Sequence, residues 1–198
     1  RWCFIEKPAA HTADDARALM GPRVLVGHSE RHNPALRRGI PEWWRHAVIT
    51  RTAPSSGRCR DVDVALDLML HDLDLLLACR GEPRVLDVRG TWGEDDVLDD
   101  VHALLRWPDG SDAALHASRL GAQRERTWRL RGGGRTVCLD LDVPLLAGQA
   151  DALTAQWQAF VDAVYGRSAL PMASADAAAA VELAARISAR AHEGAGRA

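Results

Sequence analysis

Hydrophobic and polar positions along the first thirty residues predict a short strand, a helix and a second strand. The apolar run 2–5 predicts a strand. Thr12, followed by two acidic residues, is typical of a helix N-cap, and that helix is expected to end at Gly21-Pro22. The apolar run 23–28 predicts another short, buried strand. This order is that of the last part of a βαβ unit, the building block of parallel sheets.

Beyond residue 45 the pattern is dominated by strands. They are predicted over 46–52 and at about 84–92, 100–107, 113–120, 125–131 and 135–143. Hairpin turns at 108–110 and 132–134 indicate that the later strands run antiparallel. Further helices are predicted over 63–79, 149–165 and 174–192. The fold class expected is therefore α/β, with an open, mainly antiparallel sheet that follows the βαβ element.

Alternation along two of these strands predicts how the sheet is buried. Apolar side chains recur at every second position, which places them on one face: Ala103, Leu105, Trp107, Ala113, Leu115 and Ala117. Either helices or a partner chain is expected to cover that face. The last two helices cover only one face, so the open face is expected to be an interface of a homo-oligomer.

Composition excludes several classes of protein. The chain has 198 residues, 47% hydrophobic and 26% charged, as ordinary soluble proteins do. A formal net charge of −2 gives no reason to expect nucleic acid or a membrane surface as partner. No apolar run approaches the ~18 residues of a membrane span. The 4 cysteines include no CxxC pair, which favours a reduced, cytoplasmic setting.

Three polar residues stand out in the apolar helix predicted over 63–79. Asp67, His71 and Asp74 are spaced as i, i+4 and i+7, a narrow polar stripe on a helix that is otherwise apolar almost all round. Polar groups on a buried helix are costly unless they have partners or face a cleft. An Asp–His pair one turn apart orients an imidazole for proton transfer. The alternative is a solvated stripe with a weak ion pair.

Lys7, in the stretch FIEKP, is the only lysine among 25 basic residues. Arginine does not replace lysine where a compact amine must share a proton. Lys7 is thus a candidate for chemistry, although arginine bias alone also explains its rarity. A zinc site built from His28, His32, Cys59, Asp67 and His71 lacks the close ligand spacing of zinc motifs, so no metal is expected.

The ordered motifs EKP, VGHSERHNP and DLMLHDLD resemble the Gfo/Idh/MocA oxidoreductase family over almost the whole chain. The resemblance implies a remnant of a dinucleotide-binding Rossmann domain over 1–31 and a substrate-binding and oligomerisation α/β domain over 32–198. Within the family, the chain is most similar to nucleotide-sugar dehydrogenases, including those that oxidise the 3-hydroxyl of UDP-N-acetylglucosamine.

The resemblance also implies roles for individual residues. His71 would be the base, Asp67 would orient it, and Lys7 would bind the reacting oxygen beside the nicotinamide of NAD or NADP. Glu6 and Pro8 would join Lys7 at the cofactor. Contacts to the sugar or its phosphate are expected from Arg31 and Asn33, with capping of the next turn as the alternative for Asn33.

The chain departs from the family at one important point. The glycine-rich G-x-G-x-x-G loop that binds the pyrophosphate has no counterpart in the sequence. The cluster 132–134 lies between two predicted strands and is expected to be a hairpin turn instead. Most of the Rossmann domain is therefore expected to be missing, and the chain alone to be inactive. A non-catalytic module for sugar binding or dimerisation stays open.

Overall fold

The computed structural model of the chain describes residues 1–54, 61–93, 96–169 and 174–195. Cys59, one of the zinc ligands considered above, lies outside these residues. The elements are, in order, β1 (Cys3–Glu6), α1 (Ala13–Leu19), β2 (Val24–Gly27), η1 (Ser29–His32), η2 (Pro34–Leu36), β3 (His46–Thr52), η3 (Ala65–Met69), α2 (Leu70–Arg80), β4 (Arg84–Trp92), β5 (Leu98–Arg106), β6 (Asp112–Ser118), β7 (Glu125–Gly132), β8 (Arg135–Asp140), α3 (Ala152–Val164) and α4 (Ser174–Ala195). Every predicted strand and helix is present, and the expected α/β class is confirmed.

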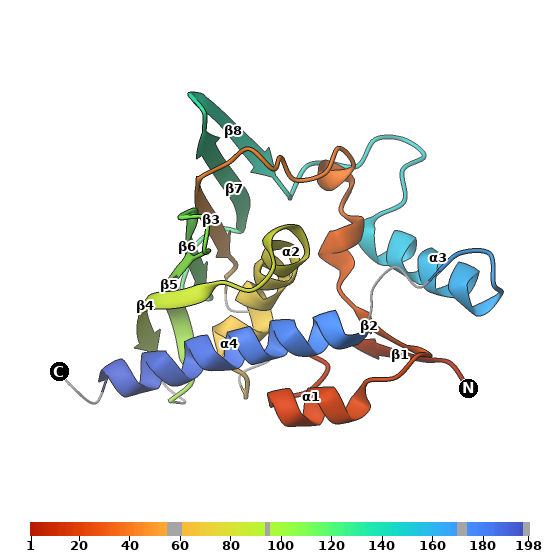
Figure 1. Ribbon diagram of the computed structural model, residues 1–198, viewed down its shortest axis with the longest axis horizontal. Coiled ribbons are helices and arrows are strands. Elements are labelled where there is room, and N and C mark those ends of the chain that lie inside the picture. The colour runs from red at the N-terminus through yellow and green to blue at the C-terminus, as the bar shows by residue number, and fades with distance from the viewer. Residues whose placement is uncertain (55–60, 94–95, 170–173, 196–198) are drawn as a thin grey trace.

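The larger sheet has the strand order β4-β5-β6-β3-β7-β8 (Figure 1). β3 lies between β6 and β7, parallel to the first and antiparallel to the second. The later strands therefore do not form one continuous antiparallel run, because an earlier strand separates β6 from β7. The sheet is mixed, with one parallel pair among antiparallel ones.

Two hairpins follow the predicted turn chemistry. Gly110 has a φ of 81°, and Gly133 and Gly134 have φ values of 54° and 71°, a backbone region that glycine adopts without strain. Arg131 pairs with Thr136 across the second hairpin. The glycine cluster is thus a turn between β7 and β8, as predicted, and does not lead into a helix.

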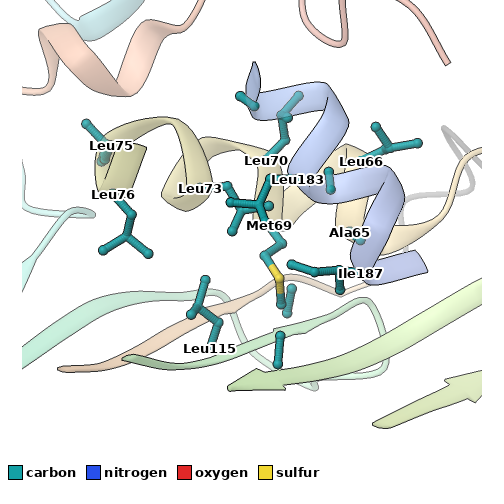
Figure 2. Close-up of a cluster of buried hydrophobic side chains, with 14 of the residues drawn as sticks. Ala65, Leu66, Met69, Leu70, Leu73, Leu75, Leu76, Leu115, Leu183 and Ile187 are labelled. Atoms are coloured by element: carbon teal, nitrogen blue, oxygen red, sulfur yellow. The ribbon is translucent and has the colours of Figure 1, made fainter. Parts of the chain in front are cut away.

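One face of the sheet is buried beneath η3, α2 and α4 (Figure 1). The alternating side chains predicted for this face are all at most 4% exposed. Figure 2 shows Met69 extending from η3 toward Leu115 of β6, with Leu183 and Ile187 of α4 beside it. Both helices therefore share one hydrophobic core with the inner face of the sheet.

The helix predicted over 63–79 begins with a π turn, η3, and continues as α2. Its apolar side chains are buried almost all round, as its composition predicts. A π turn is rare and is frequently found at functional sites. Here it lies at Asp67, one of the candidate site residues.

The N-terminal part forms a parallel pair, β1 with β2, connected by α1. Thr12 caps α1 as predicted, since its hydroxyl accepts a hydrogen bond from the Asp15 amide. The carboxyl end of β1 therefore lies beside that of β2, and the chain continues there into Lys7. None of the described helices is both long and apolar enough to cross a membrane.

Candidate active site

Lys7 follows β1, and Asp67 of the π turn holds its ammonium group. The Lys7 Nζ donates to the backbone carbonyl oxygen of Asp67 at 2.6 Å and to its Oδ1 at 3.1 Å. The two side chains are 19% and 17% exposed, so the pair is shielded and still reachable. Arg119 Nε lies 3.4 Å from the other carboxylate oxygen of Asp67. The carboxylate is thus placed between two cations, and the ammonium is fixed at one position.

His71 lies at the edge of a pocket of about 470 Å³. Its Nδ1 is buried and has no hydrogen-bond partner among the residues that the structure describes. Burial lowers the pKa of His71 well below its ordinary value, and the positive charges of Arg51 and Lys7 lower it further. The imidazole is therefore neutral near pH 7 and has a nitrogen available to accept a proton.

The predicted hydrogen bond between Asp67 and His71 is not found in the described part of the chain. The Asp67 carboxylate faces Lys7 and Arg119 instead. In a π turn the backbone hydrogen bonds join residues five apart instead of four. Two residues four apart therefore no longer lie directly above one another. Asp67 therefore positions the lysine rather than the imidazole.

The three predicted catalytic residues come together only in part. Lys7 contacts Asp67 across 60 residues of sequence, and its charge reaches His71 strongly enough to lower the imidazole pKa. Lys7 and Asp67 do not themselves line the pocket that His71 borders. The Lys7 ammonium therefore lies outside the pocket lining and acts on His71 through its charge.

The proposed cofactor residues lie at the carboxyl end of β1. Glu6 is the last residue of the strand, and its side chain is exposed. Lys7 and Pro8 follow, joined by a cis peptide bond. This is the strand end at which parallel sheets bind dinucleotides.

Arg31 and Asn33 are both engaged with protein groups. Arg31 forms a two-point ion pair with the buried Asp74, with both N···O distances 2.7 Å. Asn33 lines the pocket, but its Nδ2 donates to Glu30 and to the carbonyl oxygen of Leu141. Its Oδ1 accepts from the Ala35 amide, which is the capping role considered for it. The geometry gives Arg31 and Asn33 structural roles.

A buried ion-pair network below the pocket was not predicted. Arg51 of β3 donates to Asp72 of α2 at 2.6 and 2.9 Å and to Glu30 at 3.1 Å. Trp128 Nε1 also donates to Asp72, at 2.8 Å. The carboxylates of Asp72 and Glu30 outweigh burial and raise the pKa of Arg51. The signal was present in the alternation of β3, which places Arg51 on the same buried face as Ile49.

Two further arginines line the pocket and were also missed. Arg126 donates to Glu30 at 3.0 Å, and Arg124 lies 2.8 Å from Asp142. Burial and the nearby Arg51 lower the pKa of Arg126. From the sequence, these two residues are expected to be exposed charges at the start of a strand. The pocket lining also carries Glu30, Asp142 and Asp151, so three carboxylates accompany the two arginines.

Comparison with known proteins shows that the chain is similar to sugar dehydrogenases. No family model matches it. The UDP-N-acetylglucosamine 3-dehydrogenase of Acidithiobacillus ferrooxidans is 34% identical over 152 residues, which cover 70% of this chain and 47% of that protein. The chain thus spans about half the length of this curated relative.

Solved structures agree with this match. The structure of the Acidithiobacillus ferrooxidans enzyme is 27% identical with a TM-score of 0.79, over 96% of this chain and 70% of that chain. The scyllo-inositol dehydrogenase of Lactobacillus casei, solved with NAD(H) and scyllo-inositol, shares the fold at 16% identity and a TM-score of 0.78, over 98% and 72%. The sequence match and the shared fold therefore show that this chain is similar to the carboxyl-terminal part of sugar dehydrogenases of the Gfo/Idh/MocA type.

Proposed function

We propose that this chain carries the sugar site and the proton-transfer residues of an NAD- or NADP-dependent dehydrogenase. Its substrate would be a nucleotide sugar, oxidised at a secondary hydroxyl, specifically the 3-hydroxyl of UDP-N-acetylglucosamine. One observation carries the proposal: the Lys7 ammonium is fixed by Asp67, and its charge adds to the burial that lowers the pKa of His71, which borders a pocket of about 470 Å³. The relatedness to an enzyme of that activity supports the choice of substrate.

His71 and Lys7 divide the work on the reacting hydroxyl. The neutral imidazole accepts the hydroxyl proton as the carbon–hydrogen bond breaks. Lys7 donates a hydrogen bond to the same oxygen and stabilises its developing negative charge. Asp67 holds the ammonium in place, and a bulkier guanidinium would not fit the same short contacts.

Two arginines of the pocket are the candidate groups for binding the charged part of a nucleotide sugar. Arg124 and Arg126 border the same pocket as His71. Guanidinium groups bind phosphate oxygens in two-point contacts, so this pair suits a diphosphate. Asp142 and Glu30 hold the arginines and limit how much of each is available.

NAD or NADP, when bound, supplies the hydride acceptor for this reaction. Glu6, Lys7 and Pro8 stand at the strand end suited to the nicotinamide side of the cofactor. No G-x-G-x-x-G occurs in the sequence to bind the pyrophosphate. We therefore expect the purified chain to show no micromolar affinity for either cofactor in calorimetry, and tight binding would contradict this expectation.

The function is tested by following nicotinamide reduction with UDP-N-acetylglucosamine. The chain alone is expected to be inactive at micromolar cofactor, because no glycine-rich loop binds the pyrophosphate. The assay therefore uses millimolar NAD or NADP to compensate for weak binding. Lys7→Met and His71→Asn are expected to lower the rate by about 10² or more. Arg129→Gln, an exposed position on β7, serves as the control and is expected to leave the rate unchanged.

The same experiment separates the enzyme from a non-catalytic module. The missing glycine-rich loop is the observation that keeps the module in consideration. If UDP-N-acetylglucosamine binds but no nicotinamide is reduced at any cofactor concentration, the module is favoured. If the sugar nucleotide does not bind, the proposed substrate is wrong.

A further inference from the structure

We propose that Asp100 and His102 of β5, with His116 of β6, form a binding site for a divalent transition-metal ion such as Zn²⁺. One ligand atom from each of the three residues lies within 4.8 Å of the others. Two imidazoles and a carboxylate are a common donor set for zinc in proteins. The site lies on the open face of the sheet and shares no residue with the pocket beside His71.

The strand geometry explains why these residues gather. Asp100 and His102 are two apart on β5, so both side chains point to the same face. His102 is paired directly with His116 across the β5–β6 ladder. The intervening Val101 faces the core and is fully buried. The cluster is therefore set by the register of two central strands.

The ligand atoms of the three side chains already lie close together. His116 Nε2 lies 2.9 Å from Asp100 Oδ2, and His102 Nε2 lies 3.4 Å from Asp100 Oδ1. Ligands at zinc distances of about 2.0–2.2 Å in a tetrahedron are roughly 3.3 Å from one another. The two imidazole rings are stacked, with centroids 4.0 Å apart and planes 5° from parallel. Because a metal ion lies in the plane of each imidazole that coordinates it, the rings must turn out of this parallel arrangement to bind one ion.

One neighbouring cation opposes a metal ion at this site. Arg89 of β4 pairs with His102 and opposes a cation, but its side chain is 83% exposed and lies 3.3 Å from Asp87. Its opposition is therefore weakened by solvent and by that carboxylate.

The same face offers a matched control. His46 of β3 and Asp112 of β6 are 3.0 Å apart, a second His–Asp pair in register across two strands. A third charged group at that pair is Arg106, which lies 3.5 Å from Asp112. A guanidinium has no lone pair to offer, so Arg106 cannot act as a metal ligand. This pair therefore resembles the proposed site in exposure and chemistry and lacks the third donor.

The test is calorimetric titration of the purified chain with Zn²⁺, together with the absorption spectrum after addition of Co²⁺. The titration is made on a Cys3→Ser, Cys138→Ser background, since both thiols are exposed. One ion per chain is expected to bind. His102→Gln and His116→Gln are each expected to weaken binding at least about tenfold, since even indirect contacts to a metal are worth that much. His46→Gln is expected to leave the affinity unchanged.

The three replaced histidines lie outside the hydrophobic core, so their replacement is not expected to unfold the sheet. Circular dichroism checks this, and the outcomes are therefore decisive. Visible Co²⁺ bands of a four-coordinate site that disappear in both variants support the proposal. Absence of Zn²⁺ binding, or binding that is equally strong in His102→Gln, His116→Gln and His46→Gln, overturns it.

Discussion

At the residue scale, Lys7 connects Asp67 with His71. Asp67 holds the Lys7 ammonium through its carbonyl and carboxylate oxygens. Burial lowers the pKa of His71, and the positive charges of Arg51 and Lys7 lower it further. The site therefore combines a fixed hydrogen-bond donor, Lys7, with a neutral imidazole.

The pKa of His71 is expected to respond to Lys7. In a titration followed by NMR, the His71 ring of the unmodified chain should have its midpoint below that of an ordinary histidine. Lys7→Met should raise that midpoint, because a neighbouring positive charge is removed. Arg186→Met is the control, since that charge does not act on His71. An unchanged midpoint in Lys7→Met would show that the two side chains are too far apart to cooperate.

The lowered pKa values also make the stability of the fold depend on pH. His71 and the buried His28 bind protons less readily in the folded chain than in the unfolded chain. The contribution is therefore fully present above the ordinary histidine pKa of about 6.5 and is lost as the pH falls below it. Urea unfolding at a series of pH values is expected to show a falling free energy of unfolding below that point. A free energy that does not change between neutral and mildly acidic pH would contradict the burial of these two rings.

Part of the site was readable from the sequence and part was not. The isolation of Lys7 among arginines and the polar stripe with Asp67 and His71 selected three residues, two of which the structure brings into contact. The contact that fixes Lys7 was not predicted, because it joins residues 60 apart and depends on a π turn. A single π turn changes a few backbone hydrogen bonds and leaves the hydrophobic pattern of the helix almost unaltered. The sequence pattern therefore does not show it.

At the scale of elements, β3 connects the site to the sheet. It lies between β6 and β7, and its Arg51 joins the sheet to α2 through Asp72 and to η1 through Glu30. Buried ion pairs of this kind add little net stability when complete, but loss of one partner leaves charges without compensation. The network therefore holds the elements around the pocket in a fixed arrangement.

Arg51→Met is expected to be strongly destabilising. It leaves the carboxylates of Asp72 and Glu30 buried with fewer partners, and the expected loss in the free energy of unfolding is about 3–5 kcal/mol. The exposed Arg129→Met on β7 is the matched control and is expected to change it by less than about 0.5 kcal/mol. Urea unfolding measures both. Equal, small effects in the two variants would mean that the network is not formed.

The elements themselves followed well from the sequence, whereas their order in the sheet did not. Alternation and turn glycines gave the strands and the two hairpins, because these depend on neighbouring residues. The place of β3 depends on contacts with strands some sixty residues later along the chain. A short alternating strand has no local feature that selects its neighbours.

For the whole molecule, the open face of the sheet carries exposed apolar side chains. Val48 is 52% exposed and pairs with Ala114, which pairs in turn with Leu104, so an apolar strip crosses three central strands. Monomeric proteins limit such patches. Two copies packed about a twofold axis would cover the strip, as predicted for a homo-oligomer.

Light scattering with one pair of variants tests this assembly. The unmodified chain is expected to have the mass of an oligomer at micromolar concentration. Val48→Glu is expected to shift it to the monomer, because a charge would be buried in the interface. Leu146→Glu, on a side chain that is 70% exposed and lies outside the sheet, should have no effect. A monomer mass for the unmodified chain would remove the interface.

The most direct test of the proposed site uses the fact that Lys7 is the only lysine. Labelling lysine with ¹³C at Cε gives a single side-chain signal in this chain. Saturating UDP-N-acetylglucosamine is expected to shift that signal, because the ammonium meets the reacting sugar hydroxyl, and UDP alone is expected to shift it much less. If UDP-N-acetylglucosamine binds, as shown by tryptophan fluorescence, and the Lys7 signal does not move, Lys7 is not part of the substrate site and the proposed mechanism is wrong.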